Sequence, residues 1–284
     1  MPDSTQQKYR LQRCHPELRV TPEDYTPFMG EQRVESLKSL ARPLQGTRWA
    51  HVNSTMNGGG VAELLRSVIP LASSLGLDAQ WHVISGSDAF FEVTKKFHNL
   101  LQGVSQPISL HDLFSTYLDT ISANGTSASI ESDFIVVHDP RPLGLVNSGV
   151  LLGNVLWRCH IDTSSRDPVV WRFLVSYINQ CAGAIFTMPQ FVGAGVHIPQ
   201  YEISPCIDPL TVKNHQYSQE EALTILSPLC EASNVDAERP LSLEVALYIE
   251  RSLAQCGRRQ GVAFHVTPPF ASQFDPEADA PWVG

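Results

Sequence analysis

Two kinds of hydrophobic spacing alternate along the chain. Short, dense apolar runs of the kind that is buried in a sheet predict strands over residues 47–53, 80–85, 133–138, 155–161, 184–187 and 201–203. Between them, apolar residues that recur every three or four positions predict helices over residues 61–75, 90–102 and 168–179. This alternation is typical of an α/β fold with a mainly parallel sheet, for which a Rossmann-like, doubly wound arrangement is the expected topology.

Glycine and proline mark where several of these elements end. Gly76 and Gly103 follow two of the predicted helices, where the chain usually turns out of the helical conformation. Pro70 lies within a predicted helix, so we expect a kink or a short break there. Residues 104–130 show no regular spacing, and no element is predicted in them.

The composition divides the chain into four parts. Residues 1–45 form a polar arm with one short helix near residues 30–40, and residues 46–215 form the Rossmann-like domain. Residues 216–266 are predicted to be a helical extension, because Ser218-Gln-Glu-Glu221 has the pattern of a capping box and a second helix is expected at 242–256. Residues 267–284 are rich in proline and are expected to be a loose tail.

The charge balance and the targeting signals exclude several classes of function. The 284 residues carry 29 acidic and 20 basic side chains, a formal charge of −9, so nucleic acid is not an expected partner. The polar N-terminus does not resemble a secretory signal, and no apolar stretch is long enough to span a membrane. Six scattered cysteines without metal-ligand spacing predict free thiols in a cytoplasmic protein with no metal.

Polar clusters follow three of the predicted strands. The first runs from Asn53 to the three successive glycines Gly58, Gly59 and Gly60, where the backbone and the first N–H groups of the next helix suit a phosphate or a sugar oxygen. A tight turn without a ligand would explain the same residues. The second cluster is His138-Asp139, where the carboxylate would accept hydrogen bonds from sugar hydroxyls or would only cap the following segment.

The third cluster consists of Arg158, His160 and Asp162, which follow the next strand. His160 would donate to a substrate oxygen or would bond a backbone carbonyl in the core, and either Asp167 or Ser165 would only cap the helix at Pro168. Ligands collect beyond the carboxyl ends of parallel strands, so all three clusters together predict a site for a small hydroxylated molecule at one edge of the sheet. The sequence has neither a GxSxG nucleophile elbow nor an HExxH metal motif.

Five segments resemble the retaining GT-B glycosyltransferases that make or phosphorolyse α,α-trehalose. They are Val52–Leu64, Trp81–Gly103, Val137–Pro142, Trp157–Asp162 and Ser204–Leu210, in order within residues 22–215. The resemblance is to the N-terminal, acceptor-side half of that two-domain family, so a single GT-B-type half is expected. It implies that Gly58–Gly60 lie near the donor phosphate and the transferred glucose, that Asp139 holds acceptor hydroxyls, and that His160 contacts the transferred sugar.

The same resemblance implies further positions and partners. By the resemblance, Asn53, Glu63 and Arg158 are expected to bind substrate. From their places at the strand ends, Asp162 is also expected to bind substrate and His138 to take part in catalysis with Asp139 and His160. No cofactor is expected, and a nucleotide sugar or sugar phosphate is the implied co-substrate. Residues 218–284 are too few for the second, donor-binding half, so a homodimer or a separate donor-domain chain is the expected partner.

Two other functions are compatible with these residues. An enzyme of another class would use His138, Asp139 and His160 as acid–base groups on a small molecule in an isomerisation, cyclisation or elimination. A non-catalytic sugar-binding or remnant protein would retain the pocket without turnover.

Overall fold

The computed structural model describes residues 9–105, 109–211, 214 and 218. Contacts divide the chain into two units, Met1–Ile207 and Asp208–Gly284. In the second unit the described residues form a turn in which the Leu210 N–H donates to Oδ1 of Asp208. The predicted helical extension, except for Ser218, and the predicted tail lie outside the described residues.

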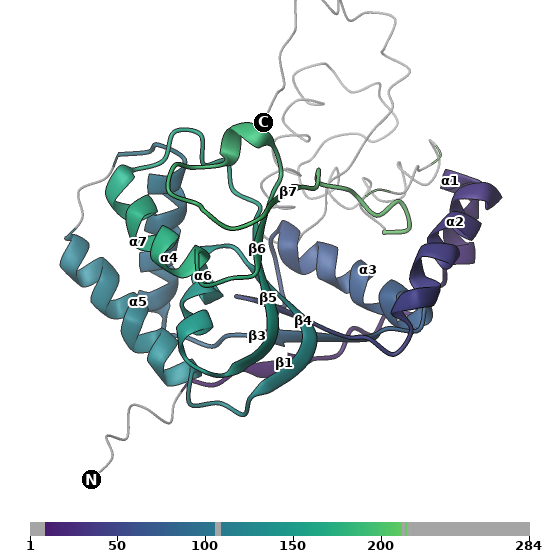
Figure 1. Cartoon of the computed structure of the whole chain (residues 1–284), viewed down its shortest axis with the longest axis horizontal. Helices are drawn as coiled ribbons and strands as arrows, with labels where there is room; N and C mark the ends of the chain where they lie inside the picture. The colour runs from purple at the N-terminus through teal and green to yellow at the C-terminus, as the bar shows by residue number, and fades with distance from the viewer. Residues whose placement is uncertain (1–8, 106–108, 212–213, 215–217, 219–284) are drawn as a thin grey trace, which may run out of the picture. The chain divides into compact units, whose positions relative to one another are not determined.

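A seven-stranded sheet forms the centre of the first unit (Figure 1). Its spatial order is β1-β3-β2-β4-β5-β6-β7, and every neighbouring pair is parallel except β1 with β3. The strands are β1 (Gln12–Cys14), β2 (Arg48–Asn53), β3 (Asp78–Val83), β4 (Ile130–His138), β5 (Leu151–Cys159), β6 (Gly183–Phe186) and β7 (Gln200–Glu202). The chain passes from β2 outward to β3 and then returns to β4 on the other side of β2. A topological switch point therefore lies between β2 and β4, which is where ligands bind in open α/β sheets.

Helices cover both faces of this sheet, as a doubly wound fold requires. The helices are α1 (Thr26–Met29), α2 (Glu31–Ala41), α3 (Gly60–Ser74), α4 (Asp88–Leu101), α5 (Leu110–Asn124), α6 (Pro140–Leu143) and α7 (Pro168–Ile178). The described residues also form single turns of 3-10 helix at Pro22–Tyr25, Arg42–Leu44, Gly144–Asn147 and Pro189–Phe191. Figure 1 shows α4, α5, α6 and α7 on one side of the sheet and α3 on the other, with α1 and α2 beyond it. The predicted α/β fold with a mainly parallel sheet is confirmed.

Local signals explain where the helices begin and end. Helix α3 ends in a Schellman motif, in which Gly76 has a φ of 95° and the Leu77 N–H donates to the Ala72 carbonyl. The expected break at Pro70 does not occur, because α3 continues through that residue. Helix α7 begins as predicted, since Oδ1 of Asp167 accepts hydrogen bonds from the N–H groups of Val169 and Val170.

Several elements were not predicted from the sequence, among them α5 and β1. Residues 104–130 contain α5, whose inward residues Leu113, Tyr117 and Ile121 follow the helical period and whose N-cap is Ser109. The polar arm contains β1, which joins the edge of the sheet through β3. Its three residues are too few to show an alternating pattern.

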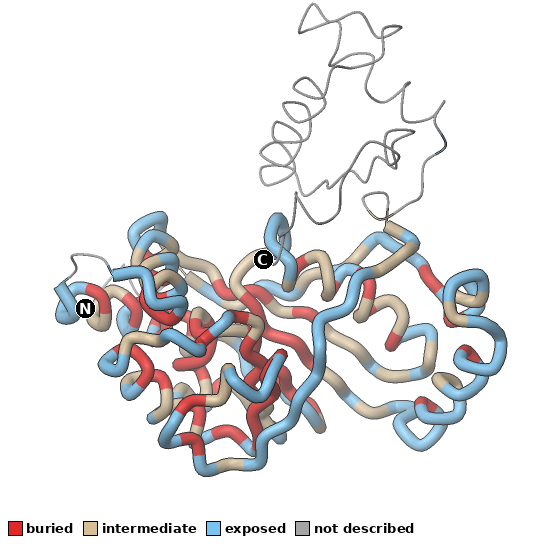
Figure 2. The backbone as a smooth tube through the Cα atoms, turned by 90° about the horizontal axis from the view of Figure 1, so that it is seen from above, coloured by how far each residue is buried: buried red, intermediate tan, exposed pale blue. Residues whose placement is uncertain are grey.

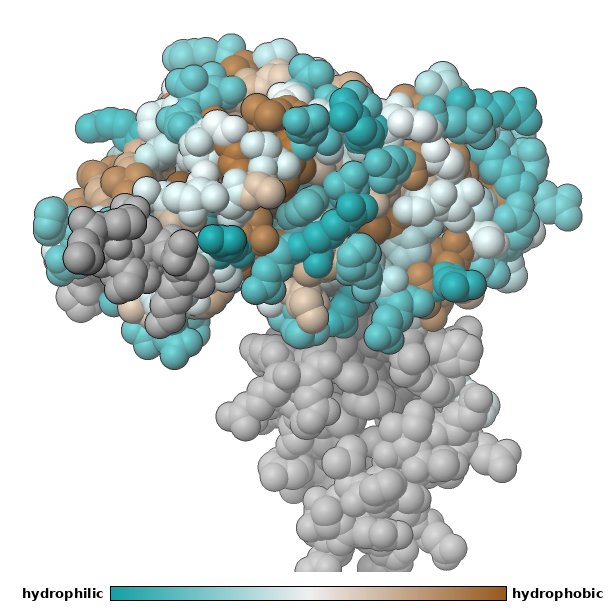
Figure 3. Space-filling model, turned by 90° about the horizontal axis from the view of Figure 1, so that it is seen from below, coloured by the Kyte–Doolittle hydropathy of each residue, from teal (hydrophilic) through white to brown (hydrophobic). Residues whose placement is uncertain are grey.

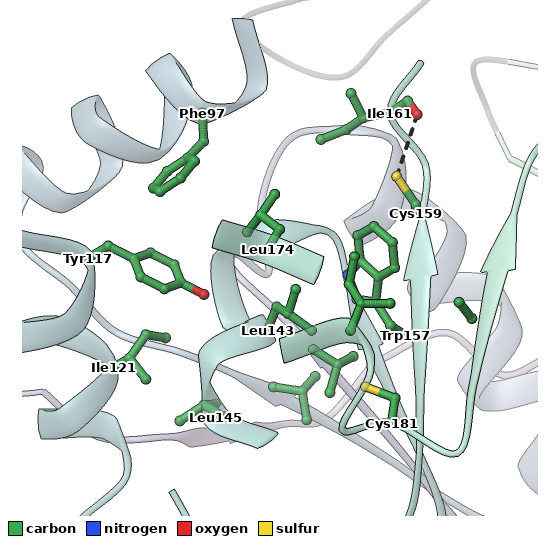
Figure 4. Packing of buried hydrophobic residues seen from close by; sticks show 14 of the residues in the cluster. Phe97, Tyr117, Ile121, Leu143, Leu145, Trp157, Cys159, Ile161, Leu174 and Cys181 are labelled. Carbon is green, nitrogen blue, oxygen red and sulfur yellow. Dashed lines mark hydrogen bonds between the residues drawn. The ribbon is translucent and has the colours of Figure 1, made fainter. Parts of the chain in front are cut away.

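The larger core lies between the sheet and the helices α4 to α7. It contains Phe97 of α4, Tyr117 of α5, Leu143 of α6, Leu174 of α7 and Trp157 of β5, all fully buried (Figure 4). Figure 2 shows buried residues concentrated along the strands and on the helices packed against them. Each such side chain contributes about 1.5–3 kcal/mol on burial, so this layer fixes the positions of the central strands.

A smaller core lies on the other face of the sheet. It consists of Ala62, Leu65 and Ile69 of α3 packed on Trp81 and Val83 of β3. On the face shown in Figure 3, hydrophilic side chains predominate and hydrophobic ones are scattered among them. None of the described helices is both long and apolar enough to cross a membrane.

Candidate functional site

The three predicted polar clusters follow β2, β4 and β5, which are adjacent parallel strands. Their carboxyl ends therefore lie at one edge of the sheet, beside the switch point. We call this edge the rim, made of residues 53–60, 138–141 and 158–162. Hydrogen bonds join its segments. Nη1 of Arg141 donates to Oγ of Ser54, and Oδ1 of Asp139 accepts the His160 N–H.

The glycine segment of the rim is an open turn. Gly58 and Gly59 have φ values of 74° and 82°, which L side chains rarely adopt. A Cβ at Gly58, Gly59 or Gly60 would meet nothing within 4 Å, so the backbone there faces open space. Helix α3 begins at Gly60 and carries Glu63 in its first turn. The turn therefore presents the start of a helix, an arrangement that can bind a phosphate or a hydroxyl oxygen.

Asn53 is committed to holding this turn. Its side chain is buried, donates to the Thr55 carbonyl, and accepts a 2.8 Å hydrogen bond at Oδ1 from Nε1 of Trp81. Both ends of the amide are therefore used within the protein. Asn53 positions the turn.

Asp139 has an unusual backbone and a well-defined partner. It is the one non-glycine residue with positive φ in the described part of the chain, at φ 61° and ψ −179°. Its Oδ1 accepts the His160 N–H at 2.8 Å, and no side-chain bond caps α6. The capping interpretation is therefore wrong. Burial raises the pKa of Asp139 to about 6, although the hydrogen bond from His160 and the nearby Arg141 lower it in part.

Arg141 is a rim residue that sequence reasoning missed. Its Nε donates to Thr94 of α4 at 2.9 Å, and its guanidinium lies 5.6 Å from the ring centre of Phe91. Burial lowers its pKa, and the negative charge of Asp139 opposes that shift. Its position two residues after Asp139, which follows a predicted strand, was the sequence feature that could have identified it.

The second and third clusters meet through their imidazoles. Nδ1 of His138 and Nε2 of His160 are 2.9 Å apart. The His160 ring therefore contacts a second imidazole, which differs from the alternative in which it bonds a backbone carbonyl in the core. His138 is buried and His160 is part-buried. Burial, with smaller contributions from neighbouring imidazoles and Arg158, lowers the pKa of His138 well below its usual value. Burial and Arg158 lower that of His160 to about 4.

Arg158 and Asp162 occupy the outer part of the rim. Arg158 donates from Nη2 to the Ile203 carbonyl at 3.2 Å, whereas its buried Nε has no hydrogen-bond partner among the described residues. Asp162 is exposed, and its Oδ1 accepts the Ser164 N–H in a local turn. Hydrogen bonds therefore bring His138, Asp139 and His160 together. Arg158 is aligned beside His138 in the sheet, whereas Asp162 lies apart from this group.

Two further features bear on the chemistry. A cavity of about 410 Å³ lies between the segment Arg13–Thr21, α3 and the start of β3, and none of the predicted site residues lines it. Within the described ranges, no group of three or more histidine, cysteine, aspartate or glutamate side chains is arranged to hold a metal ion. The rim is therefore characterised by carboxylate, imidazole and guanidinium groups and exposed backbone.

Comparison with known proteins gives the family. A model of the trehalose synthase N-terminal domain matches residues 51–193. The trehalose synthase of Pyrococcus horikoshii is 39% identical over 228 residues, which are 80% of this chain and 54% of that protein. That of Rubrobacter xylanophilus is 36% identical over 244 residues, 84% of this chain and 58% of that protein. The chain thus spans about half the length of these curated relatives.

Weaker similarity is found to two further proteins. A trehalose phosphorylase from Grifola frondosa is 34% identical over 180 residues, 55% of this chain and 25% of that protein. Among solved structures, a UDP-forming α,α-trehalose-phosphate synthase from Burkholderia vietnamiensis aligns with a TM-score of 0.41 at 12% identity, over 67% of this chain and 53% of that one. The family match includes the end of β2, all of β3 to β6, and every segment of the rim. The chain belongs to the trehalose synthase N-terminal domain family and is a glycosyltransferase-like domain.

Proposed function

We propose that this chain forms the acceptor-side half of a sugar-transfer site that makes or cleaves α,α-trehalose. The rim would hold the hydroxyls of a hexose acceptor and part of a hexosyl donor. The observation that carries the proposal is the junction at the ends of β4 and β5, where Oδ1 of Asp139 accepts the His160 N–H. This junction lies beside the topological switch point between β2 and β4.

Asp139 is suited to bind a sugar hydroxyl. Its Oδ1 is occupied by the His160 N–H, whereas none of the hydrogen bonds within the described residues uses Oδ2. An ionised carboxylate with one oxygen fixed and one oxygen available accepts a strong, directional hydrogen bond from a hydroxyl. The first oxygen would orient the group and the second would bind the acceptor.

The donor requires groups that this half supplies only in part. A nucleotide sugar or a sugar phosphate develops negative charge as its leaving group departs, and positioned cations or N–H groups stabilise that charge by several kcal/mol. The Gly58–Gly60 turn would supply N–H groups, but Arg141 is already bound to Thr94 and Ser54. We therefore propose that a second copy of the chain or a separate donor-binding chain completes the site.

The acid–base alternative is less well supported by the electrostatics. A histidine that acts as a general acid must carry a positive charge at the working pH. Burial lowers the pKa of His160 to about 4, and burial also holds the pKa of His138 well below its usual value, so both imidazoles are neutral near pH 7. Neutral imidazoles suit hydrogen bonding to a sugar better than proton donation.

The first experiment measures glucose binding by the full chain with isothermal titration calorimetry. Asp139→Asn should weaken binding at least about tenfold, because hydrogen bonds to a charged group contribute about 1.5–3 kcal/mol. The matched control is Asp119→Asn, at an exposed aspartate of α5, which should leave affinity unchanged. Equal affinity of the two variants, or no binding of glucose, trehalose or UDP-glucose by any of them, would overturn the proposed site.

The second experiment tests the need for a partner. The chain is incubated with glucose and UDP-glucose, alone over a range of concentrations and together with the separately produced C-terminal half of the Pyrococcus horikoshii trehalose synthase. Trehalose formation that rises steeply with chain concentration indicates self-association, and formation only in the mixture indicates a separate donor half. Glucose binding without turnover under any condition would instead support a non-catalytic sugar-binding protein.

A further inference from the structure

Three histidines lie in a row across the centre of the sheet. His51 of β2 is aligned with Val136 of β4, two residues before His138, and His138 is aligned with Arg158 of β5, two residues before His160. Because side chains two residues apart in a strand point to the same face, all three imidazoles lie on one face of the sheet. That face is the one covered by α3, since His51 is also aligned with Trp81 of the smaller core.

The imidazoles are hydrogen-bonded to one another in sequence. Nδ1 of His51 is 2.9 Å from Nε2 of His138, and Nδ1 of His138 is 2.9 Å from Nε2 of His160. The rings stack, with centroids 5.2 Å apart in each pair and interplanar angles of 22° and 17°. The nitrogens pair with each other along a line, which differs from the convergence on one point that a metal site requires.

The row constrains where the protons lie. All three imidazoles are neutral near pH 7, because burial lowers the pKa of each; that of His51 falls to about 3. A neutral imidazole has one N–H donor and one bare acceptor nitrogen. Each contact uses Nδ1 of one ring and Nε2 of the next, so either every ring carries its proton on Nδ1 or every ring carries it on Nε2.

The buried end of the row distinguishes these two arrangements. Nε2 of His51 is buried and has no hydrogen-bond partner among the described residues. Orphaned buried N–H donors are rarer in proteins than under-used acceptors, so the bare lone pair belongs at this nitrogen. The proton of His51 then lies on Nδ1, which donates to Nε2 of His138. By the same pairing, Nδ1 of His138 carries a proton and donates to Nε2 of His160.

We propose that His51 and His138 are positioning residues that lock His160 in its Nδ1–H tautomer, so that His160 presents a hydrogen-bond donor to the rim. No described residue is hydrogen-bonded to Nδ1 of His160, and the side chain is only part-buried. The donor would pair with an acceptor oxygen of the ligand, such as a sugar hydroxyl or a phosphate oxygen. The kind of ligand assigned here rests on the proposed function. The claim that His51 and His138 fix the tautomer of His160 does not depend on it.

The wild-type chain provides the first test. Histidine imidazoles are labelled with ¹⁵N in the full chain without any sugar, and two-bond ¹⁵N–¹H correlation spectra at pH 7.5 report which ring nitrogen carries the proton. The expected result is the Nδ1–H tautomer for His51, His138 and His160 alike. A mixed set of tautomers would show that the three rings are not coupled through their hydrogen bonds. Three Nε2–H tautomers would show that the hydrogen bonds run from His160 to His51, and would overturn the proposed Nδ1–H tautomer of His160.

A variant tests whether the buried end controls the rim. In His51→Asp, an ionised carboxylate is a pure acceptor and should switch both His138 and His160 to Nε2–H. A protonated carboxyl can still donate and should leave both as Nδ1–H. The ¹³C shift of the introduced carboxyl identifies its charge state, and any other combination of charge state and tautomers contradicts the proposal.

A second variant serves as the matched control. His51→Phe removes the first donor without introducing an acceptor, and Nε2 of His138 becomes the buried end. Both remaining imidazoles should therefore keep Nδ1–H, and different tautomers in the two rings would contradict the coupling. These spectra need no ligand, so the two proposals can fail separately. Unexpected tautomers would not contradict the proposed sugar site, and an absence of glucose binding would not contradict the coupling of the three histidines.

Discussion

The backbone of Asp139 provides a sharp test of the rim geometry. Its φ of 61° and ψ of −179° lie in a region that is almost restricted to glycine. The strand end is fixed by hydrogen bonds from the Asp139 N–H to the Arg158 carbonyl and from Nε1 of Trp157 to the Asp139 carbonyl. We therefore expect this conformation to persist when the side chain is replaced.

The informative quantity is the difference between Asp139→Gly and Asp139→Ala. Both variants lose the carboxylate and its bond to His160, so those effects cancel. Glycine relieves backbone strain of about 1–3 kcal/mol. It also makes the unfolded chain more flexible than alanine does, which costs about 0.4–1 kcal/mol. The glycine variant should therefore be more stable by about 1 kcal/mol.

The assay is urea unfolding of the full chain, followed by tryptophan fluorescence. The control is the same pair of substitutions at Lys95, an exposed position within α4, where glycine should be less stable than alanine by about 1 kcal/mol. The sign of the difference must reverse between the two sites. If alanine is at least as stable as glycine at position 139, the backbone there is not strained and the account of the turn is wrong.

The remaining predictions concern pH and the buried tyrosine. The pKa of Asp139 rises from 3.8 to about 6 on folding, so the folded chain binds that proton more tightly than the unfolded chain does. As the pH rises from 4 to 7, the free energy of unfolding of the wild type should therefore fall by roughly 2–3 kcal/mol relative to that of Asp139→Asn. Unfolding curves of both proteins at several pH values measure this, and a constant difference would contradict it. Tyr117→Phe should lower the free energy of unfolding by about 1–3 kcal/mol, because it leaves the Pro140 carbonyl and the Gly144 N–H without their bonds to the hydroxyl. Matched midpoints for the two proteins in urea would show that those groups find other partners.

Much of the domain could be predicted from residue order. The apolar runs of β2, β4 and β6 and the periodic helices α3, α4 and α7 were predicted within a few residues, because burial on a sheet or along a helix stripe imposes a pattern on nearby residues. Helix α5 was missed because serine, threonine, asparagine and aspartate dilute its apolar stripe. Strand β1 was missed because pairing with β3, rather than any local pattern, makes it a strand.

In the candidate site, too, some features followed from residue order and others depended on contacts between distant parts of the chain. Asp139 and His160 lie together at one edge of the sheet, as expected, because adjacent parallel strands place their carboxyl ends at the same edge. The connections within the site were not predicted. Arg141 reaches Ser54, 87 positions earlier in the chain, and the bond depends on how α6 packs beside β2.

The order of apolar and polar residues is enough to set the alternation of strands and helices, and hence which polar residues lie at strand ends. The contacts of His51 with His138, 87 positions away, and of His138 with His160 depend instead on how the strands pair. Strand order and register are set by packing of the whole sheet against its helices. A single strand carries no information about which residue its neighbour will place beside it.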